Sequence, residues 1–258
     1  MSALAFLLLA KRLELTRQTA KDTDVAAALC SRFQVAAAAA IEERGQFCVA
    51  VPGGSVLAML AGLPSYIIDW SKVVLAYVNH KCLPLDDEKA THAKAVKLFL
   101  SASPGVTVIV PTGGPDASQE SQLYASKLAA EKRLPKSNSG TPIFDLMLLG
   151  MGSDGHIGSL YPGKPEVLRT STCVLGVQKS SGPGSITLSL ETMNAARSVI
   201  IAMTGASKGE AVRTCLEDTH KPGDFPAAMV SCPGGMTWLL DEGAASKLAA
   251  GNGVSKLM

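Results

Sequence analysis

His156 and Asp154 are the two side chains of this sequence best suited to acid–base chemistry. They lie in a glycine-rich loop that follows the apolar residues 143–149, which only Asp145 interrupts. An unperturbed histidine has a pKa near ~6.5 and can take a proton from water at neutral pH. A neighbouring carboxylate can fix its tautomer and orientation. We therefore predict that His156 is a general base and that Asp154 orients it, with a purely structural histidine as the alternative.

The glycines before His156 have the spacing of a dinucleotide-binding loop. Gly150, Gly152 and Gly155 match the pattern GxGxxG. That pattern requires a helix directly after it, but Pro162 interrupts the following residues. It also requires an acidic residue at the end of a later strand, which the sequence lacks. We therefore interpret these glycines as shaping the loop that presents His156, and we expect Gly152 and Gly155 to approach the ligand.

Alternating strands and helices must position this loop. Apolar runs predict strands at residues 47–51, 73–78, 106–110, 143–149, 172–177, 186–190, 199–203 and 236–240. Helical spacing predicts helices at residues 24–44, 56–63, 88–101, 117–133, 208–216 and from 241 towards the end. The alternation predicts one α/β domain over residues 1–258, with a modified Rossmann-like, mostly parallel sheet and helices on both faces.

Four predicted strands end in polar or glycine-rich turns. These turns are residues 52–55, 79–81, 150–156 and 204–208. In a parallel sheet the carboxyl ends of the strands share one edge, and ligands bind in the crevice outside it. We therefore expect the four turns to meet around one site.

The turn at residues 52–55 is a candidate anion cradle. Between a strand and a helix, Gly53 and Gly54 offer backbone N–H groups and Ser55 offers a hydroxyl. A tight turn that simply needs glycine is an equally good interpretation. Lys208, at the start of a later helix, would add a positive charge to the same anion, although alone it is typical of a solvated surface lysine.

Composition excludes several classes of function. The net charge is +2 over 258 residues, and no basic stripe is present, so nucleic acid and anionic membranes are not expected partners. The six cysteines form no Cys-x-x-Cys pair, which argues against a zinc site and a disulfide framework and predicts buried free thiols. The apolar residues 3–10 are too few to span a bilayer, and Met258 disrupts a terminal Ser-Lys-Leu signal. We expect a soluble, cytosolic protein.

The sequence resembles the 6-phosphogluconolactonases, which share their sheet with the glucosamine-6-phosphate deaminases. The resemblance extends from residue 25 to about residue 248, and its most specific part is Gly-Ser-Asp-Gly-His-Ile-Gly-Ser-Leu-Tyr-Pro at residues 152–162. Further matching parts are residues 53–55, 84–86, 187–190, 194–197, 204–205 with Lys208, and 238–245. The deaminases carry a glutamate of the ring-opening machinery where this chain has Tyr161. The resemblance therefore favours the lactonase branch.

The resemblance implies a substrate and a set of roles. The substrate would be 6-phospho-D-glucono-1,5-lactone, with His156 activating water and Asp154 orienting it. Phosphate would be held by the residues of the anion cradle, by Lys208, and by two residues after the second strand, Asn79 and Lys81. No metal and no organic cofactor are implied, and we expect a monomer or a weak homo-oligomer.

Two departures from the family pattern concern the phosphate contacts. The family usually has Asp-Glu-Arg where this chain has Asn79-His80-Lys81, and a family arginine is replaced by Ser185. Each lost charged hydrogen bond is expected to cost about 1.5–3 kcal/mol. His80 or Lys179 would have to compensate. A catalytically weak sugar-phosphate-binding relative is therefore the main alternative, and an amino-sugar-phosphate deaminase is a second.

Overall fold

The computed structural model describes residues 16–20, 22–249 and 254–256, so the apolar residues 3–10 lie outside the described part. Its centre is an eight-stranded sheet with the order β11-β1-β10-β9-β6-β2-β3-β5, in which every neighbouring pair is parallel. The strands are β1 (Thr16–Ala20), β2 (Phe47–Val51), β3 (Val73–Tyr77), β5 (Thr107–Ile109), β6 (Leu146–Leu149), β9 (Val199–Met203), β10 (Met236–Asp241) and β11 (Val254–Lys256). A second, antiparallel sheet contains β4 (Asn79–Lys81), β8 (Ser185–Leu188) and β7 (Val174–Val177).

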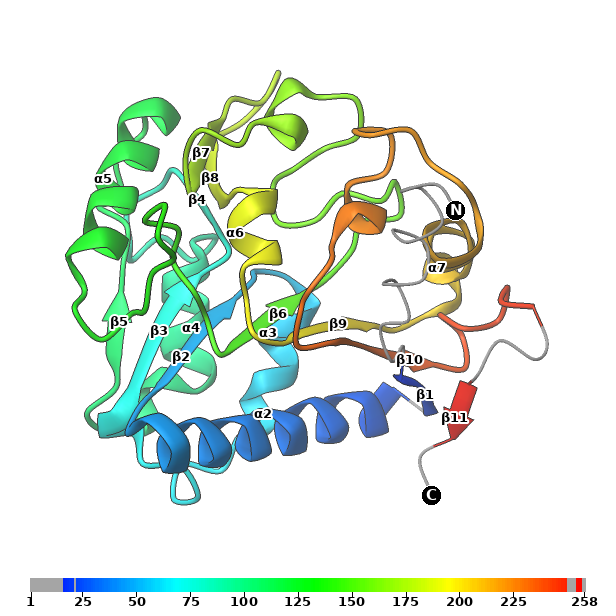
Figure 1. Cartoon of the computed structure of the whole chain (residues 1–258), viewed down its shortest axis with the longest axis horizontal. Helices are drawn as coiled ribbons and strands as arrows, with labels where there is room; N and C mark the ends of the chain where they lie inside the picture. The colour runs from blue at the N-terminus through cyan, green and yellow to red at the C-terminus, as the bar shows by residue number, and fades with distance from the viewer. Residues whose placement is uncertain (1–15, 21, 250–253, 257–258) are drawn as a thin grey trace.

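Helices cover both faces of the large sheet (Figure 1). The α-helices are α2 (Asp22–Arg44), α3 (Ser55–Met59), α4 (Thr91–Leu98), α5 (Ala117–Ala130), α6 (Leu190–Asn194) and α7 (Gly209–Glu217). Short 3₁₀ turns are η1 (Leu60–Gly62), η2 (Trp70–Lys72), η3 (Leu100–Ala102), η4 (Pro165–Leu168), η5 (Ala206–Lys208) and η6 (Pro226–Met229). Figure 1 shows α2 on one face, with α5, α6 and the antiparallel sheet on the other. The predicted α/β class, with its mostly parallel sheet, is confirmed.

Successive strands are added towards one side of the sheet up to β5 and towards the other side from β6 onwards, so the strand order changes direction between β2 and β6. From β2 the chain proceeds outwards to β3 and β5, and from β6 it proceeds the opposite way to β9 and β10. Right-handed crossovers therefore place the helices of the two halves on opposite faces. Such a reversal opens a crevice at the carboxyl ends of the two central strands, where doubly wound folds bind their ligands.

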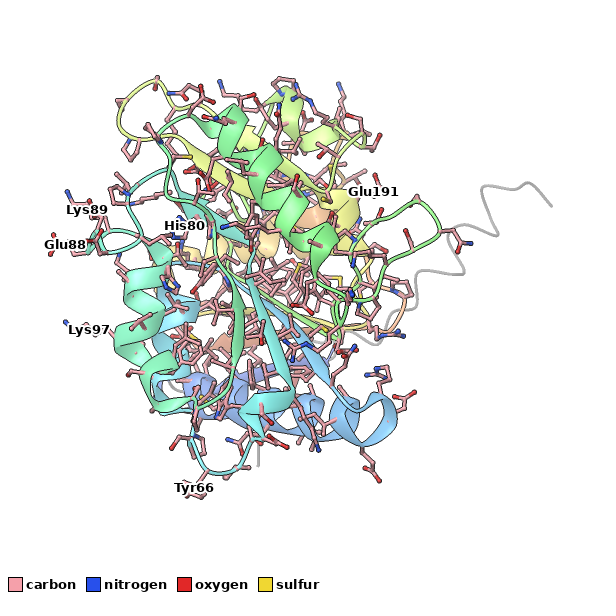
Figure 2. The ribbon with its side chains drawn as sticks, turned by 90° about the vertical axis from the view of Figure 1, so that its left-hand side faces the viewer. Tyr66, His80, Glu88, Lys89, Lys97 and Glu191 are labelled. Atoms are coloured by element: carbon pink, nitrogen blue, oxygen red, sulfur yellow. The ribbon has the colours of Figure 1, made fainter. Side chains whose placement is uncertain are left out.

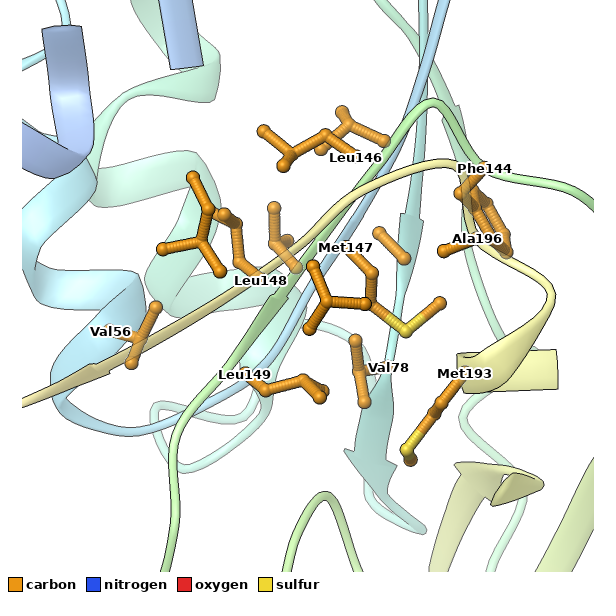
Figure 3. Close-up of a cluster of buried hydrophobic side chains, with 14 of the residues drawn as sticks. Val56, Val78, Phe144, Leu146, Met147, Leu148, Leu149, Met193 and Ala196 are labelled. Carbon is orange, nitrogen blue, oxygen red and sulfur yellow. The ribbon is translucent and has the colours of Figure 1, made fainter. Parts of the chain in front are cut away.

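The strand β6 lies at the centre of the core. All four of its residues, Leu146–Leu149, are buried. Figure 3 shows their side chains among Val56 from α3, Val78 and Met193 from α6. Because the strand is covered on both faces, its sequence is continuously apolar instead of alternating. This packing fixes the position of the loop that follows Leu149.

Asp145, which interrupts the apolar run, connects three segments at the amino-terminal edge of the sheet. Its side chain accepts a hydrogen bond from the backbone N–H of Cys48 at 2.7 Å. It also forms ion pairs with Arg44 at 3.0 Å and with Arg197 at 3.3 Å. The buried carboxylate is thus paired with charged and polar partners, which offset its desolvation.

The helix α2 is long and apolar enough, by composition, to be considered as a membrane span, with a hydropathy of 1.3 over Val25–Arg44. In the fold it packs against the large sheet. Leu29 and Phe33 are fully buried there, and Ala37 is nearly so. We therefore interpret α2 as a core helix.

The prediction of a helix from residue 241 towards the end is wrong. Turns occupy residues 242–247 and a bend follows at residue 248, and the strand β11 lies at Val254–Lys256. The Asp241 carboxylate accepts from the N–H of Ala244 at 2.6 Å and of Gly205 at 2.8 Å, which holds this segment against the turn after β9. Gly243, which follows, has a low helix propensity, and it packs so closely on the turn after β9 that a Cβ atom there would lie 2.7 Å from the backbone nitrogen of Ala206.

Three further elements differ from prediction. The strand β1 was not expected because its sequence, Thr-Arg-Gln-Thr-Ala, has no apolar pattern. The strand β4 was expected to be only a polar turn. The predicted helix at residues 88–101 is divided into α4 and η3, because Phe99 leaves the helical conformation at φ −155°.

Candidate active site

The four predicted turns meet around one cavity of about 370 Å³ at the carboxyl edge of the large sheet. Its lining comes from the segments that follow β2, β3, β6 and β9, together with the start of α4. The lining residues that matter below are Gly53, Gly54, Ser55, Asn79, Lys81, Lys89, Thr91, Lys94, Gly152, His156 and Lys208. The predicted convergence of distant turns is therefore confirmed. It lies where the strand order changes direction, between β2 and β6.

His156 is held by Asp154. The ring Nδ1 lies 2.6 Å from Asp154 Oδ1, and the backbone N–H of His156 donates to the same oxygen at 3.2 Å. Burial raises the pKa of Asp154, but the hydrogen bonds from the backbone and ring of His156 outweigh it and lower this pKa overall. The carboxylate is thus ionised and accepts a hydrogen bond from Nδ1–H, which leaves the lone pair on Nε2. Within the described residues Nε2 has no hydrogen-bond partner.

Gly152 makes room for the His156 ring. A Cβ atom on Gly152 would overlap Nδ1 of His156. The loop closes on itself here, because the N–H of Gly152 donates to the carbonyl of His156 at 2.8 Å. Gly152 lines the cavity, and the contact of its missing Cβ with the ring gives its glycine character a steric reason.

Gly155 has a different surrounding from the one predicted. It is not among the residues that line the cavity. A Cβ atom there would lie 2.6 Å from the Phe225 ring, and the φ angle of +86° is in the left-handed region. Gly155 thus allows the loop to turn and pack against η6, whose Ala227 donates its N–H to the Gly155 carbonyl at 3.1 Å.

Tyr161 covers one side of the candidate base. Its ring centroid lies 4.8 Å from that of His156, with an interplanar angle of 38°. Lys179 in turn lies 5.9 Å from the centre of the Tyr161 ring. Where the deaminase pattern would supply a carboxylate, this chain therefore places an aromatic ring against the histidine.

Asn79 organises the turn after β2. Its side-chain carbonyl accepts a hydrogen bond from the N–H of Gly53 at 3.2 Å. This contact needs only an acceptor, so an asparagine can replace the aspartate of the family pattern. Since the Gly53 N–H is already used, the N–H groups of Gly54 and Ser55 are the remaining donors of the predicted anion cradle. Gly54 adopts φ +77°, which favours glycine.

His80, which the sequence analysis named as a residue that could compensate for the lost phosphate contacts, does not reach the cavity. Its side chain is only 1% exposed and is absent from the cavity lining. Nδ1–H donates to the Lys81 carbonyl at 2.6 Å, and Nε2 accepts the backbone N–H of His92 at 3.2 Å. Burial lowers the pKa of His80, so the ring is neutral. It connects β4 to the first turn of α4.

Lys208 reaches the cavity from the turn after β9. Its ammonium donates to the carbonyl of Met151 at 3.1 Å, which links this turn to the His156 loop. Gly205, at the start of the same turn, is held by Asp241. Lys208 therefore lines the same cavity as the turn at residues 52–55, to whose anion the sequence analysis assigned its charge.

The charged residues that line the cavity are all basic. Apart from His156 they are Lys81, Lys89, Lys94 and Lys208, and no carboxylate is among the lining residues. Ser185, which replaces a family arginine, is buried opposite Lys81 in the β4–β8 pair. In the part of the chain that the structure describes, no group of three or more His, Cys, Asp or Glu residues could hold a metal ion.

Lys89, Lys94 and Thr91 were missed at the sequence level. Lys89 lies between β4 and α4, and Thr91 and Lys94 belong to the first turn of α4. In the sequence they look like ordinary polar residues of a loop and of a solvated helix face. The signal that could have revealed them was their position directly after a strand that leads to the predicted site.

A comparison with models of known protein families shows to which family this chain belongs. The profile of the family described as "Glucosamine-6-phosphate isomerases/6-phosphogluconolactonase" matches residues 20–238. The chain belongs to this family. A probable 6-phosphogluconolactonase 4, chloroplastic, from Oryza sativa subsp. japonica is 34% identical over 88% of this chain and 74% of its own length. The 6-phosphogluconolactonase of Rattus norvegicus is 32% identical over 88% of this chain and 90% of its own length.

Solved structures of the family share the fold. A 6-phosphogluconolactonase from Trypanosoma brucei has a TM-score of 0.77 at 24% identity, over 92% of this chain and all of that chain. A monomeric glucosamine-6-phosphate deaminase has a TM-score of 0.70 at 20% identity, over 90% of this chain. Since lactonases and a deaminase both share this fold, the reaction must be argued from the site.

Proposed function

We propose that this protein hydrolyses 6-phospho-D-glucono-1,5-lactone to 6-phospho-D-gluconate. The observation that carries the proposal is His156, which Asp154 holds and whose Nε2 has no partner among the residues that the structure describes. The other charged side chains that line its cavity, in the same described residues, are lysines. The relatives from rice and rat are named as 6-phosphogluconolactonases. Lysines suit the phosphate of the substrate, and a neutral imidazole suits the activation of water.

The mechanism requires only this chain and water. Nε2 of His156 takes a proton from water as the water oxygen attacks the lactone carbonyl carbon. Asp154 holds the imidazole in the required tautomer and stabilises the imidazolium that forms. The tetrahedral intermediate then collapses, the bond between the carbonyl carbon and the ring oxygen breaks, and the imidazolium returns its proton to the departing oxygen. The product is the open-chain acid, which ionises in water.

The decisive experiment replaces the base. His156→Ala should lower kcat/KM for the lactone by about 10²–10⁴-fold, the typical contribution of a general base. Acid release, followed by titration, measures the rate. His220→Ala is the matched control, because His220 does not line the cavity and bonds to the backbone of Thr214. Wild-type activity equal to spontaneous hydrolysis would reject the enzyme and leave the sugar-phosphate-binding alternative.

A deaminase function is less well supported. The position of the deaminase glutamate is occupied by Tyr161, which packs on His156. A phenol in this position does not supply the carboxylate that the ring-opening machinery needs. Ammonia release from glucosamine 6-phosphate, measured with the same preparation, tests this alternative directly.

We further propose that the protein functions in the cytosol as a monomer or a weak homo-oligomer. All six cysteines are free and five are buried, which suits a reducing compartment. The rice relative is named as chloroplastic, so fractionation of source cells is needed to test the compartment. Sedimentation at several concentrations tests the oligomeric state.

A further inference from the structure

One wall of the cavity is formed by three lysines from a single short segment. Lys81 ends β4, Lys89 precedes α4, and Lys94 lies on the first turns of α4. Lys97 belongs to the same helix but is not among the lining residues. Figure 2 shows Lys89 near the β4 end of this segment, with Lys97 farther along α4.

The three ammonium groups are close enough to influence one another. Desolvation lowers the pKa of Lys81, and the charges of Lys94, Lys179 and Lys89 lower it further, while Asp87 acts in the opposite direction. In the described residues, none of the three lining lysines forms an ion pair with a carboxylate. Repelling cations without a full set of counter-charges favour a bound anion.

The departures from the family pattern make this segment more positive. Where the family usually has Asp-Glu-Arg, Asn79 and His80 replace two carboxylates. Asn79 still accepts from Gly53, and neutral His80 is used within the fold, so neither adds a negative charge beside Lys81. The family arginine, whose guanidinium can make a bidentate contact with phosphate, is thus lost together with two negative charges.

We propose that Lys89 and Lys94, together with Lys81, bind the phosphate group of the substrate and determine its preference over unphosphorylated lactones. This proposal rests on the proposed function for the identity of the substrate. Three mobile point charges replace bidentate guanidinium contacts, so recognition depends on charge more than on fixed geometry. Thr91 also lines the cavity, but its hydroxyl already donates to the Asn79 carbonyl within the fold.

The lysine arrangement also has a structural support. His80 connects the Lys81 carbonyl to the backbone of α4, and Thr91 donates to the Asn79 carbonyl at 3.4 Å. The strand that carries Lys81 and the helix that carries Lys94 are therefore held together. This arrangement brings lysines from two elements to the same wall.

The test compares phosphorylated and unphosphorylated ligands. We would measure kcat/KM for 6-phosphogluconolactone and for glucono-1,5-lactone in Lys89→Met, Lys94→Met and the double variant. Exposed charges of this kind are each worth up to about fivefold, so the double variant should reduce the preference by about tenfold. The effect should appear mainly in KM and should shrink as salt is added.

Lys97→Met is the control, because it removes the same charge from the same helix outside the cavity. A loss of preference no larger than that of Lys97→Met, or an equal loss on both lactones, would overturn the proposal. The affinities for 6-phosphogluconate and for gluconate, measured by calorimetry, test the lysines without any turnover. They therefore distinguish a failure of this proposal from a failure of the proposed function. If the wild type does not hydrolyse the lactone, the ratio of these two affinities still tests the lysines.

Discussion

At the scale of single residues, the site depends on small side chains as much as on reactive ones. His156 is oriented by one carboxylate oxygen that accepts from both its ring and its backbone. The ring occupies space that only a glycine at position 152 leaves open. Asn79 shows how one neutral acceptor can replace a carboxylate when the contact needed is a single hydrogen bond.

Gly152→Ala should therefore reduce activity far more than stability. The added methyl group must displace the His156 ring, and a displaced base of this kind costs about 10²-fold in kcat. Lactone hydrolysis and thermal unfolding measured on the same variant check this. Gly62→Ala is the control, because its Cβ would make an ordinary 3.5 Å contact with Cys30. Equal losses of activity in the two variants would contradict the steric explanation.

At the scale of elements, the antiparallel sheet and α4 form a unit that His80 connects. Both ring nitrogens of His80 bond to backbone, one on each element. The Tyr77 hydroxyl lies 2.7 Å from Nδ1 of the neighbouring His92. Burial lowers the pKa of His80 and also of His92. This unit is therefore most stable when both imidazoles are neutral.

This predicts a loss of stability in mild acid. A lowered folded-state pKa means that the unfolded chain binds protons more readily, so the stabilisation is complete above about pH 6.5 and falls as the pH decreases below it. His80→Gln removes the titration and should lose about 1–3 kcal/mol at neutral pH through imperfect hydrogen bonds. Urea unfolding at about pH 7.5 and about pH 5.5 should show a smaller pH effect in the variant. An unchanged pH effect would assign the acid sensitivity to other groups.

The elements that position the site were largely predictable, because strands buried on both faces have continuously apolar sequences. The Asp154–His156 loop was predictable because chemistry requires these residue types close together. Lys89 and Lys94 were not, since a lysine in a polar segment has the same sequence context whether it faces bulk water or a cavity. The strand β1 was not predictable either, because its ladder depends on backbone pairing with β10 and β11 and not on an apolar pattern.

At the scale of the whole molecule, the two edges of the large sheet have different tasks. The carboxyl edge carries the cavity, where glycines and charged groups are concentrated. The amino-terminal edge carries Asp145, which ties β6 to Arg44 of α2, to Cys48 of β2 and to Arg197. Stability and chemistry are thus separated along the strands.

Asp145→Ala should lower the free energy of unfolding by about 2–4 kcal/mol, less than for a fully buried pair because the arginines are partly exposed. The variant removes an acceptor shared by two guanidinium groups and the Cys48 N–H, and among the described residues Arg44 keeps only its exposed partner Glu43. The urea midpoint measures this change, while KM for the lactone should stay unchanged because the cavity lies at the opposite edge. Asp218→Ala, which removes an exposed partner of Arg213, should have only a small effect. Similar midpoints in the two variants would contradict the proposed importance of the buried carboxylate.

The burial of the cysteines also has a consequence for how the protein is irreversibly inactivated. Burial raises the pKa of Cys48 and of Cys215 to about 12, so neither thiol forms a reactive thiolate while the fold is intact. Unfolding exposes them, and in an oxidising solution they can then form mixed disulfides that block refolding. Oxidation of these two thiols therefore requires that the chain first unfolds, so their loss under oxidising conditions is limited by unfolding.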